Sequence, residues 1–474
     1  MKKLLSIAAA LGVVTLLPLQ ANADPVRQVP FAPTTPQVGV SYSKTVPGLL
    51  TFRGNASRTF MGTGPVLNKA AIAWKYPRRA MCGKSSEYGE VRTWCGTGWA
   101  GQPAVFERAG RTWVVFGAYD HSIHFVDAAT GEDILPPFPT GDIAKGMVSV
   151  DPDGYPIIYH GSRDNKYRAI AIDGSKAREL WHINARATSE RLWNDDWDAA
   201  SLILNGHLIM TSENSRLYVA ALNRSYKRDG SVAMNPRILW STPGWDQQLL
   251  RDLGDRRVSA ESSPTVVGDV VYFVNSGGLL QGWDISSLRT GVGTPKRVLR
   301  FWTGDDTDAT VVADADGYLY VGVEVDRNTA RTKVVGQLLK IDPRKPASPL
   351  VWSRDVNCGV DCGVWGTPAL WRNTVIYTTK PGHVLGLDKQ TGKTLFDLRV
   401  GGLTLSSPVV VDDVLIQGDG AGVLRAWKLR DNAQPVALWQ VRLGANIEST
   451  PAVWKGSLYV GARNGYFFKV ATKP

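Results

Sequence analysis

The sequence is poor in the residues on which thiol, imidazole and zinc chemistry depend, with four cysteines, six histidines and six methionines among 474 residues. It contains no HExxH, GxSxG or Walker motif, so metalloprotease, nucleophile-elbow hydrolase and P-loop activities have no support. The sequence offers no candidate catalytic residue. Hydrophobic residues make up 43% of the chain, which is enough to bury a large core and excludes global disorder.

Long apolar runs are also lacking, except at the N-terminus. Two lysines after Met1 precede an apolar run over residues 4–19 and the small residues Ala21 and Ala23, which predicts a secretory signal over residues 1–23. The alternative is a retained membrane anchor, although the run is short for a span of roughly 20 residues. With no cysteine beside the cleavage point and no later apolar segment of similar length, we expect a soluble periplasmic or secreted protein without lipid modification.

No run of five like charges occurs, although the formal net charge is +11. Removal of Lys2 and Lys3 with the signal leaves +9, carried by basic residues scattered along the chain. This pattern is typical of a solvated surface, and in an exported protein it does not indicate nucleic-acid binding. We expect a monomer whose partner is an envelope protein or a small polar ligand.

The four cysteines fall into two local groups. Cys82 and Cys95 are thirteen residues apart, and Cys358 and Cys362 are four apart. An even number of cysteines in an oxidising compartment favours two local disulfides, although three pairings are formally possible. Zinc ligation is disfavoured because the spacing is not that of a CxxC pair.

What the sequence has in abundance is a repeat rich in glycine, tryptophan and β-branched residues. After a proline-rich arm over residues 24–70, Ser/Thr-Pro sequences open apolar strands at Pro264, Pro368, Pro408 and Pro451, spaced by 104, 40 and 43 residues. Each is followed by a second strand, a Gly-containing turn, a third strand and a fourth strand often centred on tryptophan. Four short strands repeated with such a period predict one propeller blade per unit.

Eight such units can be laid out between residues 71 and 474. They open near Gly101, Gly146, Asp198, Ser262, Asp308, Gly366, Ser406 and Glu448. The last unit lacks a fourth strand, whereas residues 71–76 have the fourth-strand pattern and precede the first unit. We therefore predict an all-β, eight-bladed β-propeller of four-stranded antiparallel blades, closed by an N-terminal strand, with seven blades as the alternative.

The repeat resembles that of the pyrroloquinoline-quinone-type (PQQ-type, or quinoprotein-like) β-propellers. The resemblance rests on Ser-Pro-Val-Val-Val at residues 407–411, on Leu-Gly-Leu-Asp-Lys-Gln-Thr-Gly-Lys at residues 385–393 and on a similar sequence at residues 125–132. It implies the fold, but proteins built this way include both quinone-dependent alcohol dehydrogenases and non-enzymatic envelope scaffolds. The dehydrogenases use a disulfide between adjacent cysteines, which this sequence lacks, and the scaffold of the outer-membrane assembly machinery carries a lipid on a cysteine that is also absent.

The candidate site lies on the loops that lead into first strands and on the turns that follow second strands, because both gather at one mouth of a propeller channel. As ligand-binding residues we single out Asp196, Asp198, Glu213, Glu261, Arg163, Lys380 and Arg463. As metal ligands we single out Asp306, Asp308 and Glu324, because clustered carboxylate oxygens suit Ca²⁺. The alternative is that each carboxylate caps a turn or pairs with an arginine.

The sequence therefore predicts an exported, non-catalytic binding or scaffolding propeller, with Ca²⁺ as its candidate cation. The alternative function is a periplasmic PQQ-dependent oxidoreductase acting on alcohols or sugars, in which the acidic mouth would hold Ca²⁺ and the quinone.

Overall fold

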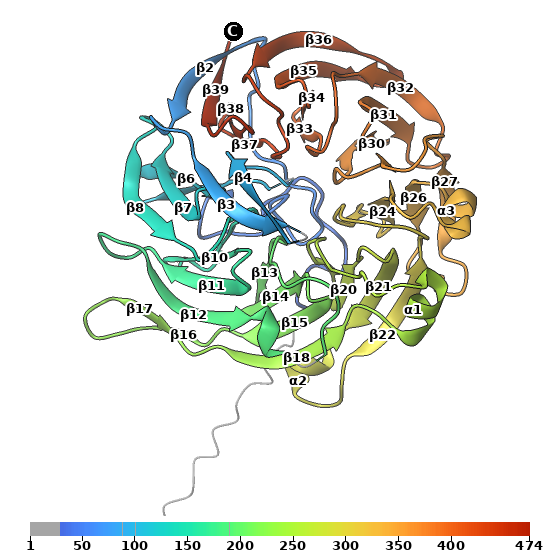
Figure 1. The fold of residues 1–474 in the computed structure, drawn as a ribbon, viewed down its shortest axis with the longest axis horizontal. Coiled ribbons are helices and arrows are strands. Elements are labelled where there is room, and N and C mark those ends of the chain that lie inside the picture. Colours follow the sequence, from blue (N-terminus) through green and yellow to red (C-terminus); the bar gives the residue numbers. More distant parts are fainter. Residues whose placement is uncertain (1–28, 88, 100, 189) are drawn as a thin grey trace, which may run out of the picture.

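The structure is a computed structural model that describes residues 29–87, 89–99, 101–188 and 190–474. The predicted signal over residues 1–23 lies outside these residues. Within them, four-stranded antiparallel sheets are arranged in a ring of eight blades around a central channel (Figure 1). The eight-bladed prediction is confirmed, and the alternative of seven blades is wrong. None of the helices found in the described residues is both long and apolar enough to cross a membrane.

Each blade runs from an inner first strand to an outer fourth strand. Blade 1 holds β5 (Ala104–Arg108), β6 (Arg111–Ala118), β7 (Ser122–Asp127) and β8 (Asp133–Pro139). Blade 2 holds β9 (Ser149–Val150), β10 (Ile157–Gly161), β11 (Lys166–Ala171) and β12 (Arg178–Asn184). Blade 3 holds β13 (Leu202–Leu204), β14 (His207–Ser212), β15 (Arg216–Ala221) and β18 (Arg237–Pro243). Blade 4 holds β19 (Thr265–Val267), β20 (Val270–Phe273), β21 (Leu279–Asp284) and β22 (Lys296–Trp302).

The second half of the ring repeats this order. Blade 5 holds β23 (Val312–Ala313), β24 (Leu319–Gly322), β26 (Leu338–Ile341) and β27 (Leu350–Arg354). Blade 6 holds β29 (Ala369–Trp371), β30 (Thr374–Thr378), β31 (His383–Asp388) and β32 (Thr394–Arg399). Blade 7 holds β33 (Val409–Val411), β34 (Val414–Gly418), β35 (Val423–Arg430) and β36 (Ala433–Arg442). Blade 8 holds β37 (Ala452–Trp454), β38 (Ser457–Gly461), β39 (Phe467–Lys473) and, from the other end of the chain, β2 (Lys69–Tyr76).

Blade 8 closes the ring by pairing the two ends of the chain. In β2, Tyr76 lies opposite Phe467 and Trp74 opposite Lys469 of β39. The Trp74 ring packs near Tyr459 and Phe467, and its Nε1 donates to the Ala128 carbonyl of blade 1 at 3.1 Å. The strand from the N-terminus therefore both completes one blade and contacts the next.

The Ser or Thr that precedes the first strand of a repeat forms a hydrogen bond to the neighbouring blade. The backbone N–H at this position in one blade donates to the hydroxyl of the equivalent residue in the next. These contacts are Ala200 to Ser263, Ser263 to Thr310, Thr310 to Thr367, Thr367 to Ser407 and Ser407 to Thr450, at 2.9 to 3.3 Å. A hydroxyl can accept this bond while fitting a narrow inner rim, so the motif joins neighbouring blades around the channel.

Residues 29–66 form an arm that runs across one face and enters the channel (Figure 1). Its strand β1 (Gly48–Leu49) pairs with β5. Beyond it, the fully buried Arg53 donates to the carbonyls of Thr367 and Pro408, at 2.8 and 2.7 Å. Arg58, also fully buried, donates to those of Pro264 and Ala200. The arm thus binds four blades from inside the ring.

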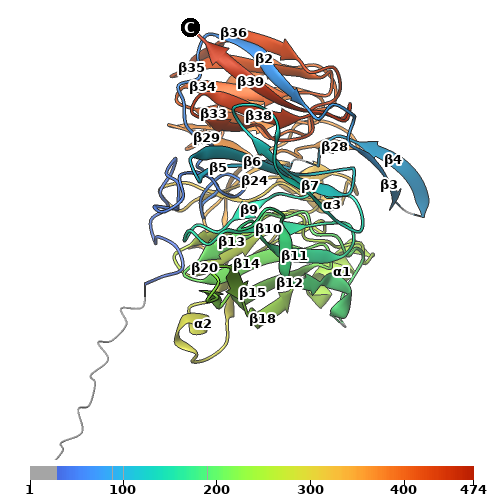
Figure 2. The same ribbon diagram turned by 90° about the vertical axis from the view of Figure 1, so that its left-hand side faces the viewer.

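The hairpin of β3 (Cys82–Glu87) and β4 (Glu90–Cys95) projects from the opposite face to the arm (Figure 2). Both predicted disulfides are present, Cys82–Cys95 at the base of this hairpin and Cys358–Cys362 in the loop before blade 6. The remaining elements are insertions between strands. They are β16 (Arg224–Tyr226), β17 (Val232–Met234), β25 (Glu324–Val325), β28 (Cys362–Gly363), a 3-10 turn at Ala185–Ala187, α1 (Gln247–Leu253), α2 (Ser287–Thr290) and α3 (Ala330–Val335).

Candidate functional site

The mouth of the channel is a cavity of about 550 Å³, which we call the cup. Its volume is within the range of small-molecule sites. The residues that line it come from the segments before first strands and after second strands, mainly in blades 2 to 6. They include Arg163, Asp196, Glu213, Glu261, Asp306, Asp308, Glu324 and Lys380, so the structure brings together eight of the ten predicted site residues. Asp198 lies directly beneath, on a smaller void that Glu261 and Asp308 also line.

The repeat delivers these side chains through one backbone hydrogen bond per blade. In blades 2 to 5 the N–H of a residue one to three places after the second strand donates to a carbonyl in the segment before the first strand. The four pairs are Arg163 to Ile143, Glu213 to Asp196, Ser276 to Ser259 and Glu324 to Asp306. We call the donor residue the trailing position, and we call the residue two places after the acceptor the leading position. Leading positions in blades 2 to 5 are therefore Lys145, Asp198, Glu261 and Asp308.

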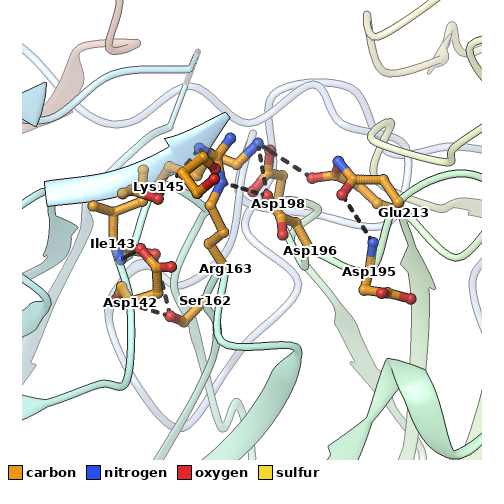
Figure 3. Close-up of polar contacts among 12 residues, drawn as sticks. Asp142, Ile143, Lys145, Ser162, Arg163, Asp195, Asp196, Asp198 and Glu213 are labelled. Atoms are coloured by element: carbon orange, nitrogen blue, oxygen red, sulfur yellow. Dashed lines mark hydrogen bonds and ion pairs between the residues drawn. The ribbon is translucent and has the colours of Figure 1, made fainter. Parts of the chain in front are cut away.

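Blade 3 presents the first carboxylate cluster, which consists of Asp196, Asp198 and Glu213 (Figure 3). The Lys145 ammonium from blade 2 lies 2.7 Å from Asp198, 3.3 Å from Glu213 and 3.4 Å from Asp196. Arg163 adds a second cation, with its Nε 2.8 Å from Asp196. All three carboxylates and Lys145 are buried, and the two cations of the protein offset most of the charge of the three carboxylates.

Burial and charge act in opposite directions on these groups. Burial opposes the charge of Lys145, but the carboxylates of Asp198, Glu213 and Asp196 outweigh it and hold the lysine pKa well above its usual range. Burial raises the pKa of Asp198 to about 6, while Lys145 lowers it. Burial likewise raises the pKa of Glu213 well above its usual range, and Lys145 lowers it, so the ammonium offsets only part of the effect of burial on this cluster.

Blade 5 presents the second carboxylate cluster, which consists of Asp306, Asp308 and Glu324. One carboxylate oxygen from each lies within 4.8 Å of the others. Two oxygens facing each other across Ca²⁺ at about 2.4 Å lie about 4.8 Å apart, so the cluster has the dimensions of a calcium site. The Glu324 side chain is 96% buried, and its Oε1 has no hydrogen-bond partner.

The second cluster differs from the first in its ion pairs. Among the described residues, no lysine or arginine forms an ion pair with Asp306, Asp308 or Glu324. The nearby Arg327 donates instead to Asp255 and to the carbonyls of Ser276 and Arg257. Burial first, and then repulsion by neighbouring carboxylates including Glu261, raise the pKa of all three members well above the usual range.

Two tryptophans form the floor of the cup. Trp99 from the segment before blade 1 and Trp365 from the segment before blade 6 meet edge to face, with ring centroids 5.6 Å apart. Trp99 Nε1 donates to Glu261 at 2.7 Å, and both rings also line the void beneath, of about 30 Å³. Met147, which lines that void, packs against Phe52 of the arm. The arm and the tryptophans thus close the channel below the cup.

Two predicted ligand residues have partners within the protein. Lys380 forms an ion pair with Asp361 at the edge of the cup and lies 4.8 Å from the Trp365 ring. Arg463 lies 3.6 Å from Glu448 and over the ring of Tyr119, away from the residues that line the cup. Sequence reasoning missed Lys145, Trp99 and Trp365. Lys145 could have been found, because it stands at the same offset before its first strand as Asp198 does.

A quinone of the PQQ type carries three carboxyl groups, so its site needs an excess of cationic partners. The lining of the cup contains ten carboxylate and six cationic side chains. Of the cations, Lys145, Arg163, Arg186, Arg327 and Lys380 already bind carboxylates of the protein. The residues present therefore do not fit a tricarboxylate.

The sequence matches no protein-family model and no curated protein. Several solved structures share its architecture. BamB from Moraxella catarrhalis has a TM-score of 0.54 and 16% identity over 85% of this chain and 98% of its own. The quinohemoprotein alcohol dehydrogenase from Comamonas testosteroni has a TM-score of 0.57 and 13% identity over 90% of this chain and 81% of its own. The computationally designed Ika8 protein has a TM-score of 0.52 and 14% identity over 78% of this chain and 94% of its own. At such identities the likeness concerns the fold alone, and the chain has the eight-bladed, quinoprotein-like β-propeller fold.

Proposed function

We propose that this protein is an extracytoplasmic, non-catalytic binding propeller whose ligand site is the cup, and that Asp306, Asp308 and Glu324 bind Ca²⁺ there. The observation that carries the proposal is a set of three carboxylates with a common centre, of which Glu324 is buried and Asp306 and Asp308 are half-buried, and which form no ion pair with a lysine or arginine in the described part of the chain. Three like charges of this kind repel one another unless an ion or protons neutralise them. Oxygen ligands alone favour Ca²⁺ over softer metals.

A bound Ca²⁺ would also give the cup a means of holding a polar ligand. If each carboxylate supplies one oxygen, the three fill half or fewer of the six to eight positions around Ca²⁺, so ligand or water oxygens would complete its shell. The ring itself is rigidly joined from blade to blade, which suits a binding surface. The two disulfides and the predicted signal support a location outside the cytoplasm.

The quinone-dependent oxidoreductase has less support, because a tricarboxylate meets an acidic lining whose cations are already paired. The two functions are separated by incubating the protein with PQQ and Ca²⁺ and following dye reduction with simple alcohols and sugars. Turnover in that assay would replace the proposed function with the enzymatic one.

Isothermal titration calorimetry with Ca²⁺ on the calcium-stripped protein tests the proposal directly. We expect one site, and an increase in melting temperature because a ligand at 100 times its Kd stabilises the folded state by about 2.7 kcal/mol. Glu324→Gln should abolish both effects and should raise the melting temperature in EGTA, since it removes one of the repelling charges. The matched control is Glu132→Gln, at an exposed carboxylate outside the cup. Equal calcium responses of the wild type and Glu324→Gln would contradict the proposal.

A further inference from the structure

The two carboxylate clusters are one local structure made twice. Each takes two aspartates, separated by one residue, from the segment before a first strand, and one glutamate from the trailing position. In each, the glutamate N–H donates to the carbonyl of the first aspartate, at 3.1 Å for Glu213 to Asp196 and 2.8 Å for Glu324 to Asp306. The same backbone therefore presents the same three side chains in blades 3 and 5.

The clusters differ in what the preceding blade supplies. The leading position of blade 2 is Lys145, whose ammonium lies among the carboxylates of blade 3. The leading position of blade 4 is Glu261, which lines the same small void as Asp308 and so places a further carboxylate, and no ammonium, beside the blade 5 cluster. One repeat position therefore carries a cation before one cluster and an anion before the other.

We infer that this position determines which cluster takes a metal ion: Lys145 is a built-in cation that replaces metal at the blade 3 cluster, whereas Glu261 supplies no ammonium at the equivalent position, which leaves the blade 5 cluster dependent on an external cation. The inference rests on the proposed function and goes beyond it, because it assigns the selection to two residues outside the three metal ligands. Glu261 also lies close to the first cluster, with an oxygen within 4.8 Å of oxygens of Asp198 and Glu213. Substitution of Lys145 would thus expose a set of carboxylates at least as rich as that of blade 5.

The test is the number of Ca²⁺ ions bound per chain, measured by equilibrium dialysis on proteins whose circular dichroism shows a folded ring. We expect one for the wild type, none for Glu261→Lys and two for Lys145→Glu. Glu261→Gln is the matched control, because it removes the charge without supplying an ammonium, and it should still bind one. Lys145→Ala provides a milder second variant, which should also bind two.

The outcomes separate the inference from the proposed function. A wild type that binds no Ca²⁺ overturns both. Suppose that the wild type binds one Ca²⁺ and that Glu261→Lys, or both Lys145 variants, bind the same number. This result overturns the inference and leaves the proposed function standing. If binding is lost equally in Glu261→Lys and Glu261→Gln, Glu261 is itself a ligand and the inferred replacement by an internal ammonium is wrong.

Discussion

Replacement of Lys145 by methionine tests the electrostatics of the cup without adding a ligand. The change removes the ammonium from Asp196, Asp198 and Glu213 while keeping a side chain of similar length. Of the three carboxylates, Asp196 retains Arg163, whereas Asp198 and Glu213 lose their ion pairs with Lys145. Breaking a buried ion pair by removing one partner costs about 3 to 5 kcal/mol.

This loss can be converted into a melting temperature. With an unfolding entropy of about 2.1 cal/mol/K per residue over roughly 450 residues, 1 kcal/mol corresponds to roughly 1 °C if the ring unfolds cooperatively. We therefore expect Lys145→Met to melt about 3 to 5 °C below the wild type at pH 8 in EGTA, measured by circular dichroism. The exposed Lys296 of β22, changed to methionine, is the control and should melt as the wild type does.

The pH dependence gives the stricter test. Burial already raises the pKa of Asp198 to about 6, and loss of Lys145 raises it further, so the folded variant holds a proton that the unfolded chain releases. A group of this kind contributes stability at low pH and loses it as the pH rises, with a slope of about 1.4 kcal/mol per pH unit. The difference in melting temperature between Lys145→Met and the wild type should therefore be less than half as large at pH 5 as at pH 8. A deficit that is the same at both values would refute the assigned role of the ammonium.

Three further predictions concern the rest of the molecule. Calcium affinity should fall as the pH is lowered from 7.5 to 5, because the carboxylates of Asp306, Asp308 and Glu324 have raised pKa values and must lose their protons to bind the ion. The groups that face them are Glu261, Arg327 and Lys380. Calorimetry in two buffers should show proton release on binding, and an affinity independent of pH would contradict this prediction. Arg58→Met should lower the free energy of unfolding by about 3 kcal/mol or more, because it removes the donor to the carbonyls of Pro264, Phe52 and Ala200. An unchanged thermal transition would show that the arm does not stabilise the ring. Trp74→Ala should lower the free energy of unfolding by about 3 kcal/mol through lost packing in blade 8. Trp74→Phe should recover most of this loss in thermal melts. Equal losses in the two variants would indicate that the indole hydrogen bond to Ala128 is the cause.

The blade count and ring closure could be predicted from the sequence because they depend on local patterns. Proline and Ser/Thr mark the start of a first strand, and a strand pattern at residues 71–76 complements a last unit that lacks one. The structure adds the reason for the Ser/Thr, which joins one blade to the next, as Ser263 does with Ala200. The convergence of Asp196, Glu213, Asp306 and Glu324 followed from the repeat as well.

What the sequence could not show is which charges are neutralised within the protein. Lys145 and Glu261 occupy equivalent repeat positions, but their different effects depend on which neighbouring cluster each side chain reaches. The meeting of Trp99 and Trp365 across the channel depends on side-chain direction, for which a repeat pattern gives no signal. The insertion of Arg53 and Arg58 into the axis was equally hidden, because an arm rich in proline and without periodicity predicts no partner.

The closure of the channel by the arm and the two tryptophans makes the cup a dead end. A molecule that binds there must enter and leave through the same opening, beside the disulfide-bonded hairpin. Any larger protein that covered this opening would at once trap the contents of the cup and slow their exchange. Occupancy of the small site and docking at this face would then be kinetically linked, without any movement of the blades.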